Sequence, residues 1–301
     1  MPIINTNSKK AKNRSQLELE LMRPLESDRN FDLGGRSFYF FDFDDNVIFL
    51  STPIVLFHKK RQEEILVSSG EFARENKNIG QSGIFADYYM NFNDENGSFR
   101  SFRDKDYSVL ERFLGKKQSF IHDIEKALNE QDHLWKAPSW NCFYHATFNQ
   151  RPISVITARG HNVQTVKDGI SLMVRDGHIP REPNYLSLYP VSNNDTRKEL
   201  GDKDLKMFVP ELKRFAIRES VERAIKDYGY SPHHRFGMSD DDEKNVELIT
   251  EEMKFLKRKY PEMSFFVIQT FKNSFVKREI LRHRTRKVNN SKLEKPQMTL
   301  L

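Results

Sequence analysis

Hydrophobic and polar residues follow one another along this chain in blocks that predict strands and helices in turn. The first block begins with four consecutive aromatic residues, Phe38 to Phe41, a run typical of a strand buried on both faces. Further along, the pattern predicts strands at 153–157, 185–191, 234–238 and 265–271, separated by helices at 163–175, 212–228 and 243–259. Strands that alternate with helices indicate an α/β fold, in which helices cover both faces of a parallel sheet.

The segment between the first strand and this alternating region has a different pattern. Two short apolar runs, 54–57 and 65–67, flank a charged loop and predict a β-hairpin. Residues 70–117 read as irregular, and helical spacing returns at 120–128, before a short helix expected near Pro138. The predicted divisions are a weakly ordered segment at 1–30, a core at 31–50 and 136–272, an inserted segment at 51–135, and a C-terminal tail at 273–301.

Composition favours a protein with a bulky core. Only 37% of the residues are hydrophobic, but 24 Phe and 10 Tyr supply large side chains. No stretch approaches the roughly 20 apolar residues that span a bilayer, and residues 1–30 lack the apolar segment of a signal peptide. The single cysteine, Cys142, excludes an intramolecular disulfide and a cysteine-clustered metal site, and we expect a buried, reduced thiol in a cytoplasmic protein.

The net charge of +6 is concentrated near the C-terminus. Residues 272–287 hold seven Lys or Arg residues against one acid, Glu279, which accounts for the whole net charge. Such a run can contact nucleic acid or an anionic membrane surface. It lacks the periodic aromatic residues on which bases stack in dedicated single-strand binders. A solvated tail is therefore the favoured interpretation, with nucleic acid as an alternative partner.

Residues that can carry chemistry stand where the predicted strands end. Asp42 and Asp44 follow the aromatic run, and alternation along an extended chain places both carboxylates on one side. The strand at 153–157 ends in Thr157, with Arg159 two residues later. Because ligands of parallel sheets bind beyond the carboxyl ends of the strands, we expect these side chains to converge on one crevice.

A second acidic group follows a later strand. The strand at 234–238 is followed by three successive acids, Asp240 to Asp242. Lys213, at the start of the preceding predicted helix, can reach the same crevice. A set of carboxylate and hydroxyl oxygens suits a hard cation.

These strand ends, in this order, resemble the motifs of the haloacid dehalogenase (HAD) superfamily of aspartate-nucleophile phosphohydrolases. Its Asp-x-Asp motif is matched by Asp42 and Asp44, and its strand ending in Thr or Ser by Thr157. The acidic pair of the family falls within Asp240–Asp242. The family's lysine is matched by position alone, best by Lys213, with Lys198, Lys203 and Lys206 as alternatives. The resemblance covers roughly residues 36–271 and implies a Rossmann-like sheet with a cap inserted at about 51–135.

The resemblance also implies a role for each matched residue. Asp42 is the expected nucleophile, which forms an aspartyl-phosphate, and Asp44 the expected acid and then base. Mg²⁺ is expected to bind Asp42, the backbone carbonyl of Asp44, and Asp240 or Asp241. Thr157 and Lys213 are expected to hold the phosphoryl oxygens, and Arg159 is a further substrate-binding candidate.

Two departures from the family pattern leave alternatives open. Asn46 stands where the family usually has Thr or Val, four residues after the nucleophile. In the acidic run the register is open, because Asn245 or Lys244 falls where a further acid often lies. Asp240 to Asp242 can also be read simply as acids that stabilise the start of the helix at Glu243.

The function expected from the sequence is a Mg²⁺-dependent phosphatase acting on a small phosphorylated substrate. Asp44 favours phosphate chemistry over dehalogenation, which needs no such acid. Two alternatives remain: a HAD-like binding protein with little or no turnover, and a phosphatase for nucleic-acid ends held by the basic tail. A phospho-receiver domain is rejected, because its acidic residues lie on different strands in a much shorter chain.

Overall fold

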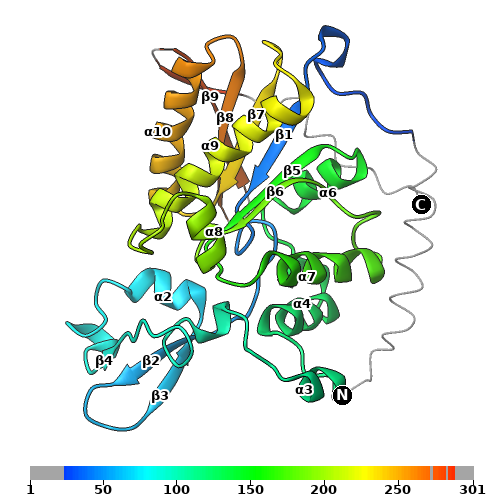
Figure 1. Cartoon of the computed structure of the whole chain (residues 1–301). Coiled ribbons are helices and arrows are strands. Elements are labelled where there is room, and N and C mark those ends of the chain that lie inside the picture. Colours follow the sequence, from blue (N-terminus) through cyan, green and yellow to red (C-terminus); the bar gives the residue numbers. More distant parts are fainter. Residues whose placement is uncertain (1–23, 272–273, 283, 289–301) are drawn as a thin grey trace.

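A seven-stranded sheet forms the centre of the molecule (Figure 1). The computed structural model describes residues 24–271, 274–282 and 284–288. The strand order is β10-β9-β8-β7-β1-β5-β6, and the pairings from β6 to β8 are all parallel. The bounds are β1 (Ser37–Phe41), β5 (Pro152–Thr157), β6 (Asn184–Pro190), β7 (Arg235–Asp240), β8 (Ser264–Phe271), β9 (Ser274–Ile280) and β10 (Thr285–Lys287). The predicted α/β class with a mostly parallel sheet is confirmed.

The basic C-terminal residues correct one prediction. β9 pairs with β8, and β10 with β9, both antiparallel, so these residues extend the main sheet. The interpretation of 273–301 as a tail is therefore wrong for 274–282 and 284–288, and residues 289–301 lie outside the described part. Charged side chains are common on edge strands, where they discourage pairing with other chains.

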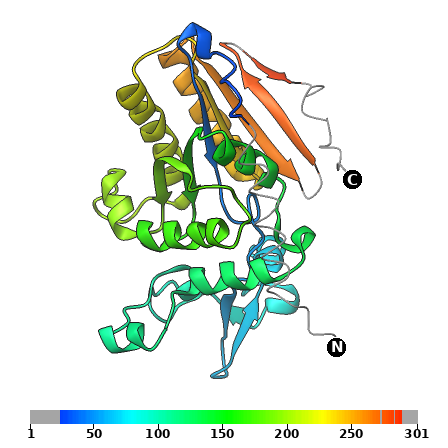
Figure 2. The ribbon, with the colours of Figure 1, turned by 90° about the vertical axis from the view of Figure 1, so that its right-hand side faces the viewer.

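Helices cover both faces of the sheet, as expected. One face carries α6 (Trp140–Phe148) and α7 (Val163–Arg175), and the other carries α9 (Val209–Tyr228) and α10 (Glu243–Lys259) (Figures 1 and 2). A short helix, α8 (Asn194–Glu199), follows β6. The bounds of α7 and α10 are those predicted from the sequence.

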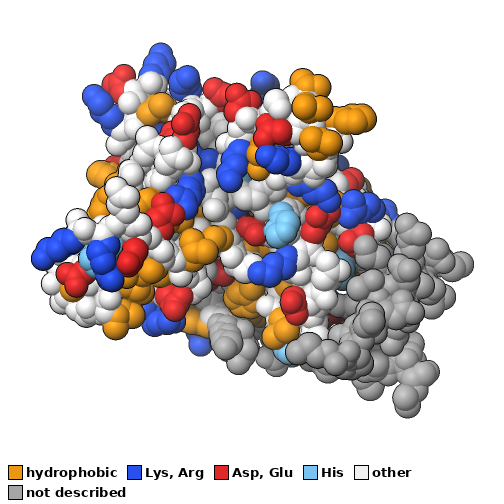
Figure 3. Space-filling model, turned by 90° about the horizontal axis from the view of Figure 1, so that it is seen from below, with side chains coloured by type: hydrophobic (Ala, Val, Ile, Leu, Met, Phe, Trp, Pro, Cys, Tyr) orange, Lys and Arg blue, Asp and Glu red, His pale blue; other side chains and the backbone are white. Residues whose placement is uncertain are grey.

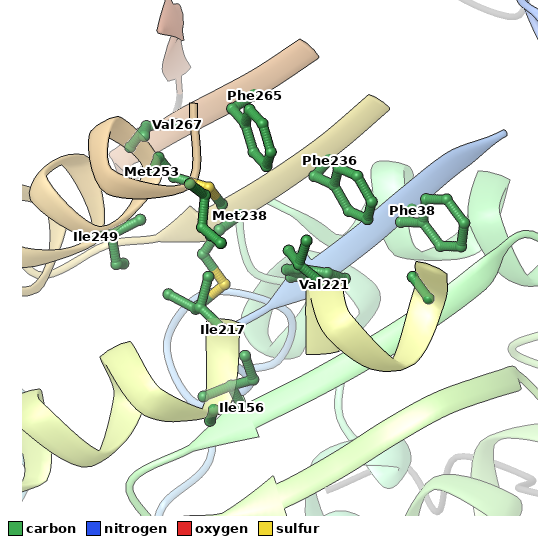
Figure 4. Packing of buried hydrophobic residues seen from close by; sticks show 14 of the residues in the cluster. Phe38, Ile156, Ile217, Val221, Phe236, Met238, Ile249, Met253, Phe265 and Val267 are labelled. Carbon is green, nitrogen blue, oxygen red and sulfur yellow. The ribbon is translucent and has the colours of Figure 1, made fainter. Parts of the chain in front are cut away.

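The core beneath α9 and α10 explains the aromatic first strand. Phe38, Phe236 and Phe265 lie side by side on three adjacent strands, with ring centroids 4.8 and 5.4 Å apart (Figure 4). Val221 of α9 packs beside Phe38 and Phe236, Ile217 of the same helix lies near Met238, and all of these side chains are buried. Aromatic pairs of this kind contribute about 0.5–1.5 kcal/mol beyond the burial of their area.

A smaller lobe lies below the main sheet (Figure 2). Its antiparallel sheet confirms the predicted hairpin, and it has a hydrophobic cluster of its own, formed by Ile54, Leu56, Val67 and Phe85. Seen from the side of this lobe, exposed hydrophobic side chains stand among charged ones (Figure 3). Its elements are β2 (Ile54–His58), β3 (Glu64–Val67), α2 (Ser69–Glu75), η2 (Gly83–Phe85), β4 (Tyr88–Tyr89), η3 (Arg100–Phe102) and α3 (Val109–Phe113). The region 70–117, predicted to be irregular, therefore contains short helices and a strand.

The lobe ends earlier than the predicted inserted segment. α4 (Ser119–Asn129) and α5 (Asp132–Trp135) pack into the cluster of the main body, on the side of α7. Gly169 of α7 permits this, because a Cβ there would lie 2.4 Å from the ring of Phe120. The boundary at residue 135 is thus replaced by one near residue 118.

Two expectations about the rest of the chain can be checked in part. Residues 1–23 lie outside the described part, but the N-terminal segment expected to be weakly ordered also includes Asp28, which is buried and accepts hydrogen bonds from Ser37. Cys142 lies exposed on α6 among the described residues, not buried as expected. No helix within the described ranges is long and apolar enough to cross a bilayer.

Candidate functional site

The predicted site residues meet at the carboxyl edge of the sheet. β1 lies between β5 and β7, so the residues that end these strands are neighbours. Asp42 follows β1, Asp240 ends β7 and Thr157 ends β5. The backbone N–H of Asp42 donates to the carbonyl of Ser239 at 2.9 Å, which continues the pairing of β1 with β7 into the site.

Lys213 joins two of the acids. Its Nζ lies 3.0 Å from Oδ1 of Asp42 and 3.0 Å from Oδ2 of Asp240, and all three residues are buried. α9 connects β6 to β7 and starts at the carboxyl edge of the sheet, where Pro210 and the cap formed by Glu211 favour helix initiation. Lys213 stands in the first turns of that helix. The lysine chosen by position alone is therefore the one that the fold brings to the acids.

Three carboxylates form the negative side of the site. One oxygen from each of Asp42, Asp240 and Asp241 lies within 4.8 Å of the others. Burial, together with the neighbouring Asp240 and Asp241, raises the pKa of Asp42 although Lys213 opposes this. Burial and the charge of Asp240 raise the pKa of Asp241 to about 7. Burial alone would lower the pKa of Lys213, but Asp240 and Asp42 outweigh it and raise that pKa.

The acids at the end of β7, Asp240 to Asp242, have two different roles. The side chain of Asp242 accepts hydrogen bonds from the backbone N–H of Lys244 and Asn245, and so caps α10. Asp240 instead faces Lys213, and its second oxygen accepts from the Asn245 side chain at 3.3 Å. Capping of the helix therefore explains Asp242, but not Asp240 or Asp241.

Asp44 belongs to a different group of side chains. Nε of Arg159 lies 3.0 and 2.9 Å from its two carboxylate oxygens, and Nη2 lies 2.6 Å from Oδ1. The hydroxyl of Thr157 donates to Oδ2 of Asp44 at 3.1 Å. Arg159 and Thr157, predicted to bind substrate, thus contact the predicted acid–base residue in this structure. The Asp44 carboxylate is not among the three clustered acids described above.

Asn46 holds the turn that follows the two acids. Its side-chain amide donates to the carbonyl of Asp42 at 2.9 Å and to the hydroxyl of Ser239 at 2.9 Å. Its side-chain oxygen accepts from the hydroxyls of Ser139 and Thr270, each at 2.9 Å. Asn46 is fully buried, and these bonds use both ends of its amide. The departure from the family pattern at this position therefore leaves the turn well supported.

Sequence reasoning missed three contributors to the site. Thr52 and Asp123 support Arg159 from two segments that are 71 residues apart in sequence. Asp45 adopts a left-handed backbone, φ 56°, and accepts a hydrogen bond from Ser69 at the start of α2. The acid at position 45 was visible in the Asp-Phe-Asp-Asp run, but no sequence pattern pointed to Thr52 or Asp123.

Comparison of the chain with protein-family models, with curated proteins and with solved structures gives no match. The chemistry of this site has to be inferred from its own geometry.

Proposed function

We propose that this protein is a Mg²⁺-dependent phosphatase of the haloacid dehalogenase type, with the smaller lobe at 53–117 as its cap. The observation that carries the proposal is the contact of Asp42 with Lys213 and Asp240 at the carboxyl edge of the sheet. Asp42 is nearly enclosed but keeps 7% of its surface exposed, as a nucleophile that meets a substrate requires.

The residues present fit a divalent cation. When ionised, Asp42, Asp240 and Asp241 carry three negative charges, and Lys213 neutralises one. A net charge of −2 remains, and the carboxylate oxygens lie within 4.8 Å of one another. Oxygen ligands of this kind are the ones that Mg²⁺ prefers. Asp42, Asp240 and Asp241 would hold the ion, and it would supply positive charge to offset the repulsion between carboxylate and phosphate.

The side chains of the site support a two-step displacement. In the first step an oxygen of Asp42 attacks phosphorus, the bond from phosphorus to the ester oxygen breaks, and Asp44 protonates that oxygen. In the second step Asp44 takes a proton from water, which attacks phosphorus and releases Asp42. Lys213 keeps a positive charge beside Asp42 throughout, because its pKa is raised. Acid–base help of this kind is worth about 10²–10⁴-fold in rate.

An assay with a generic phosphomonoester tests the proposal. The purified protein should release phosphate from 4-nitrophenyl phosphate with Mg²⁺, and should lose this activity in EDTA. Asp42→Asn should abolish turnover, whereas Asp227→Asn, an exposed acid near the far end of α9, should retain it. Turnover that persists in Asp42→Asn would refute the proposed role of Asp42.

A second candidate is a phosphatase for nucleic-acid ends. Lys277, Arg278, Arg286 and Lys287 belong to β9 and β10 of the same sheet, and β8 ends at the same edge as β1 and β7. Phe271, the last residue of β8, and Phe275, the second residue of β9, are each 44% exposed at that edge. Exposed aromatic rings beside basic strands suit stacking against bases. Faster dephosphorylation of oligonucleotide ends than of small esters, lost in Phe271→Ser/Phe275→Ser, would favour this candidate over the first.

A further inference from the structure

Arg159 is a buried cation that depends on few partners. Its side chain is 1% exposed, and its guanidinium carbon lies 4.9 Å from the ring centre of Phe102 and 4.8 Å from that of Phe120. Nε and Nη2 contact Asp44, whereas Nη1 has no hydrogen-bond partner among the described residues. Contacts with two rings restrain where the guanidinium lies, but hydrogen bonds are needed to fix how it is turned.

The only other side-chain bond of this guanidinium within the described part of the chain is to Thr52. Nη2 donates to the Thr52 hydroxyl at 2.7 Å, and that hydroxyl in turn donates to Oδ2 of Asp123 at 2.5 Å. Thr52 is 2% exposed and Asp123 8% exposed, so both bonds are protected from water. Thr52 stands where the chain leaves the main body for the smaller lobe, and Asp123 is on α4, where the chain has returned.

We propose that Thr52 and Asp123 are positioning residues, which fix the rotation of the Arg159 guanidinium and through it the orientation of the Asp44 carboxylate. The two ends of the inserted lobe would thereby set the geometry of the acid–base residue without touching substrate. The chain Asp123–Thr52–Arg159–Asp44 consists of consecutive hydrogen bonds: the Thr52 hydroxyl accepts from Nη2 of Arg159 and donates to Asp123, and Nη2 and Nε of Arg159 donate to Asp44. The catalytic part of this inference rests on the proposed function of Asp44.

Leaving-group dependence tests the catalytic part. Thr52→Val removes the hydroxyl at nearly constant volume, and Thr52→Ser keeps it. Thr52→Val should lower kcat/KM, which reports formation of the aspartyl-phosphate, for phenyl phosphate, a poor leaving group that needs a proton, by about tenfold or more. For 4-nitrophenyl phosphate, whose leaving group needs little acid help, kcat/KM should fall less than threefold, and Thr52→Ser should behave as wild type.

The control is Thr147→Val on α6. Thr147 is also fully buried, and its hydroxyl donates to a backbone carbonyl at 2.8 Å. Thr147→Val therefore removes a buried hydroxyl and its hydrogen bond, as Thr52→Val does, but away from Arg159. Thr147→Val should not lower the activity on one ester more than the activity on the other. An equal fall in kcat/KM for both esters in Thr52→Val, or the same selective fall in Thr147→Val, would overturn the positioning role.

A stability measurement separates this inference from the proposed function. Thr52 and Asp44 share Arg159 as a partner, so Thr52→Val, Asp44→Asn and the double variant should be non-additive by about threefold or more in the unfolding equilibrium constant. Additive effects would overturn the hydrogen-bonded chain even if the protein is a phosphatase. Absence of phosphatase activity in the wild type would refute the proposed function and the catalytic part of the inference. The stability measurements on the two single variants and the double variant would still decide whether Thr52 and Asp44 are coupled through Arg159.

Discussion

The two acids of the Asp-x-Asp motif lie on sides of the site that differ in charge balance. On the side that we propose binds the metal (the metal side), Asp42 shares Lys213 with Asp240, and Asp241 adds a further carboxylate. On the arginine side, Asp44 faces the guanidinium of Arg159, which makes three close contacts with it. One side therefore has an excess of negative charge, and the other is neutralised within the chain.

This difference supports the proposal that a cation binds on the side of Asp42. Buried carboxylates without enough positive charge are unfavourable, and their pKa values rise unless a cation compensates them. The pKa of Asp42 and that of Asp241 are raised in this way. A carboxylate that is paired with a guanidinium and hydrogen-bonded, as Asp44 is, needs no such compensation.

The largest effect is expected from Asp42→Asn. Loss of the nucleophile should lower kcat by about 10³-fold or more, because the covalent step has no substitute. The same change removes one of the excess negative charges, so the free energy of unfolding without Mg²⁺ should stay constant or rise. Chemical denaturation beside steady-state kinetics measures both. A strongly destabilised variant would show that the metal side is not overcharged.

Lys213→Met should destabilise the protein by about 3–5 kcal/mol, because it leaves two buried carboxylates without their cation. Lys226→Met, at an exposed position near the end of the same helix, is the matched control and should change little. Urea denaturation of the two variants at pH 7 gives the comparison. Equal stabilities would contradict the charge balance described for the metal side.

Mg²⁺ should stabilise the folded chain by about 2.7 kcal/mol when its concentration is 100 times its Kd. Asp240→Asn should remove most of this gain, whereas Asp123→Asn, a buried acid on the arginine side, should keep it. Thermal unfolding with Mg²⁺ and with EDTA measures the shift. A gain that survives in Asp240→Asn would place the ion elsewhere.

A smaller effect is expected from pH on the arginine side. Burial and the charges of Arg159 and Arg103 lower the pKa of His161 to about 2, against about 6.5 in the unfolded chain. Below pH 6.5 the unfolded chain therefore binds a proton that the folded chain does not, and stability falls as pH falls. The slope should reach about 1.4 kcal/mol per pH unit.

His161→Gln should remove this contribution between pH 6.5 and 5, and His122→Gln, whose side chain is 72% exposed, should not. Unfolding free energies measured at several pH values test the difference. An unchanged slope in His161→Gln would show that His161 is protonated in the folded state.

The main sheet and its helices were predictable because their apolar patterns are long and regular. α7 and α10 have the predicted bounds, and the hairpin at 54–67 was predicted from two short apolar runs. β9 and β10 were missed because β9 mixes apolar and charged residues without regular alternation and β10 has two basic residues among its three, as suits strands near an edge. α2 carries a capping box between Ser68 and Glu71, a sequence signal that was overlooked.

From the sequence, only those site residues that stand at the ends of strands were predictable as neighbours. Asp42, Asp240 and Thr157 end adjacent strands, so parallel topology brings them together. The pairing of Arg159 with Asp44, and its support by Thr52 and Asp123, depends on how the smaller lobe joins the main body. Contacts between segments so far apart in sequence leave no periodic signal in a single sequence.

Detection of a phosphoryl group on Asp42 tests the central claim most directly. Asp44→Asn should accumulate the intermediate, because 4-nitrophenyl phosphate can form it without an acid but its hydrolysis needs the base. After an acid quench, mass spectrometry should find one phosphoryl group on the peptide that contains Asp42, and none in Asp42→Asn/Asp44→Asn. Wild-type turnover with no phosphorylated peptide, or a phosphoryl group on another residue, would contradict the account.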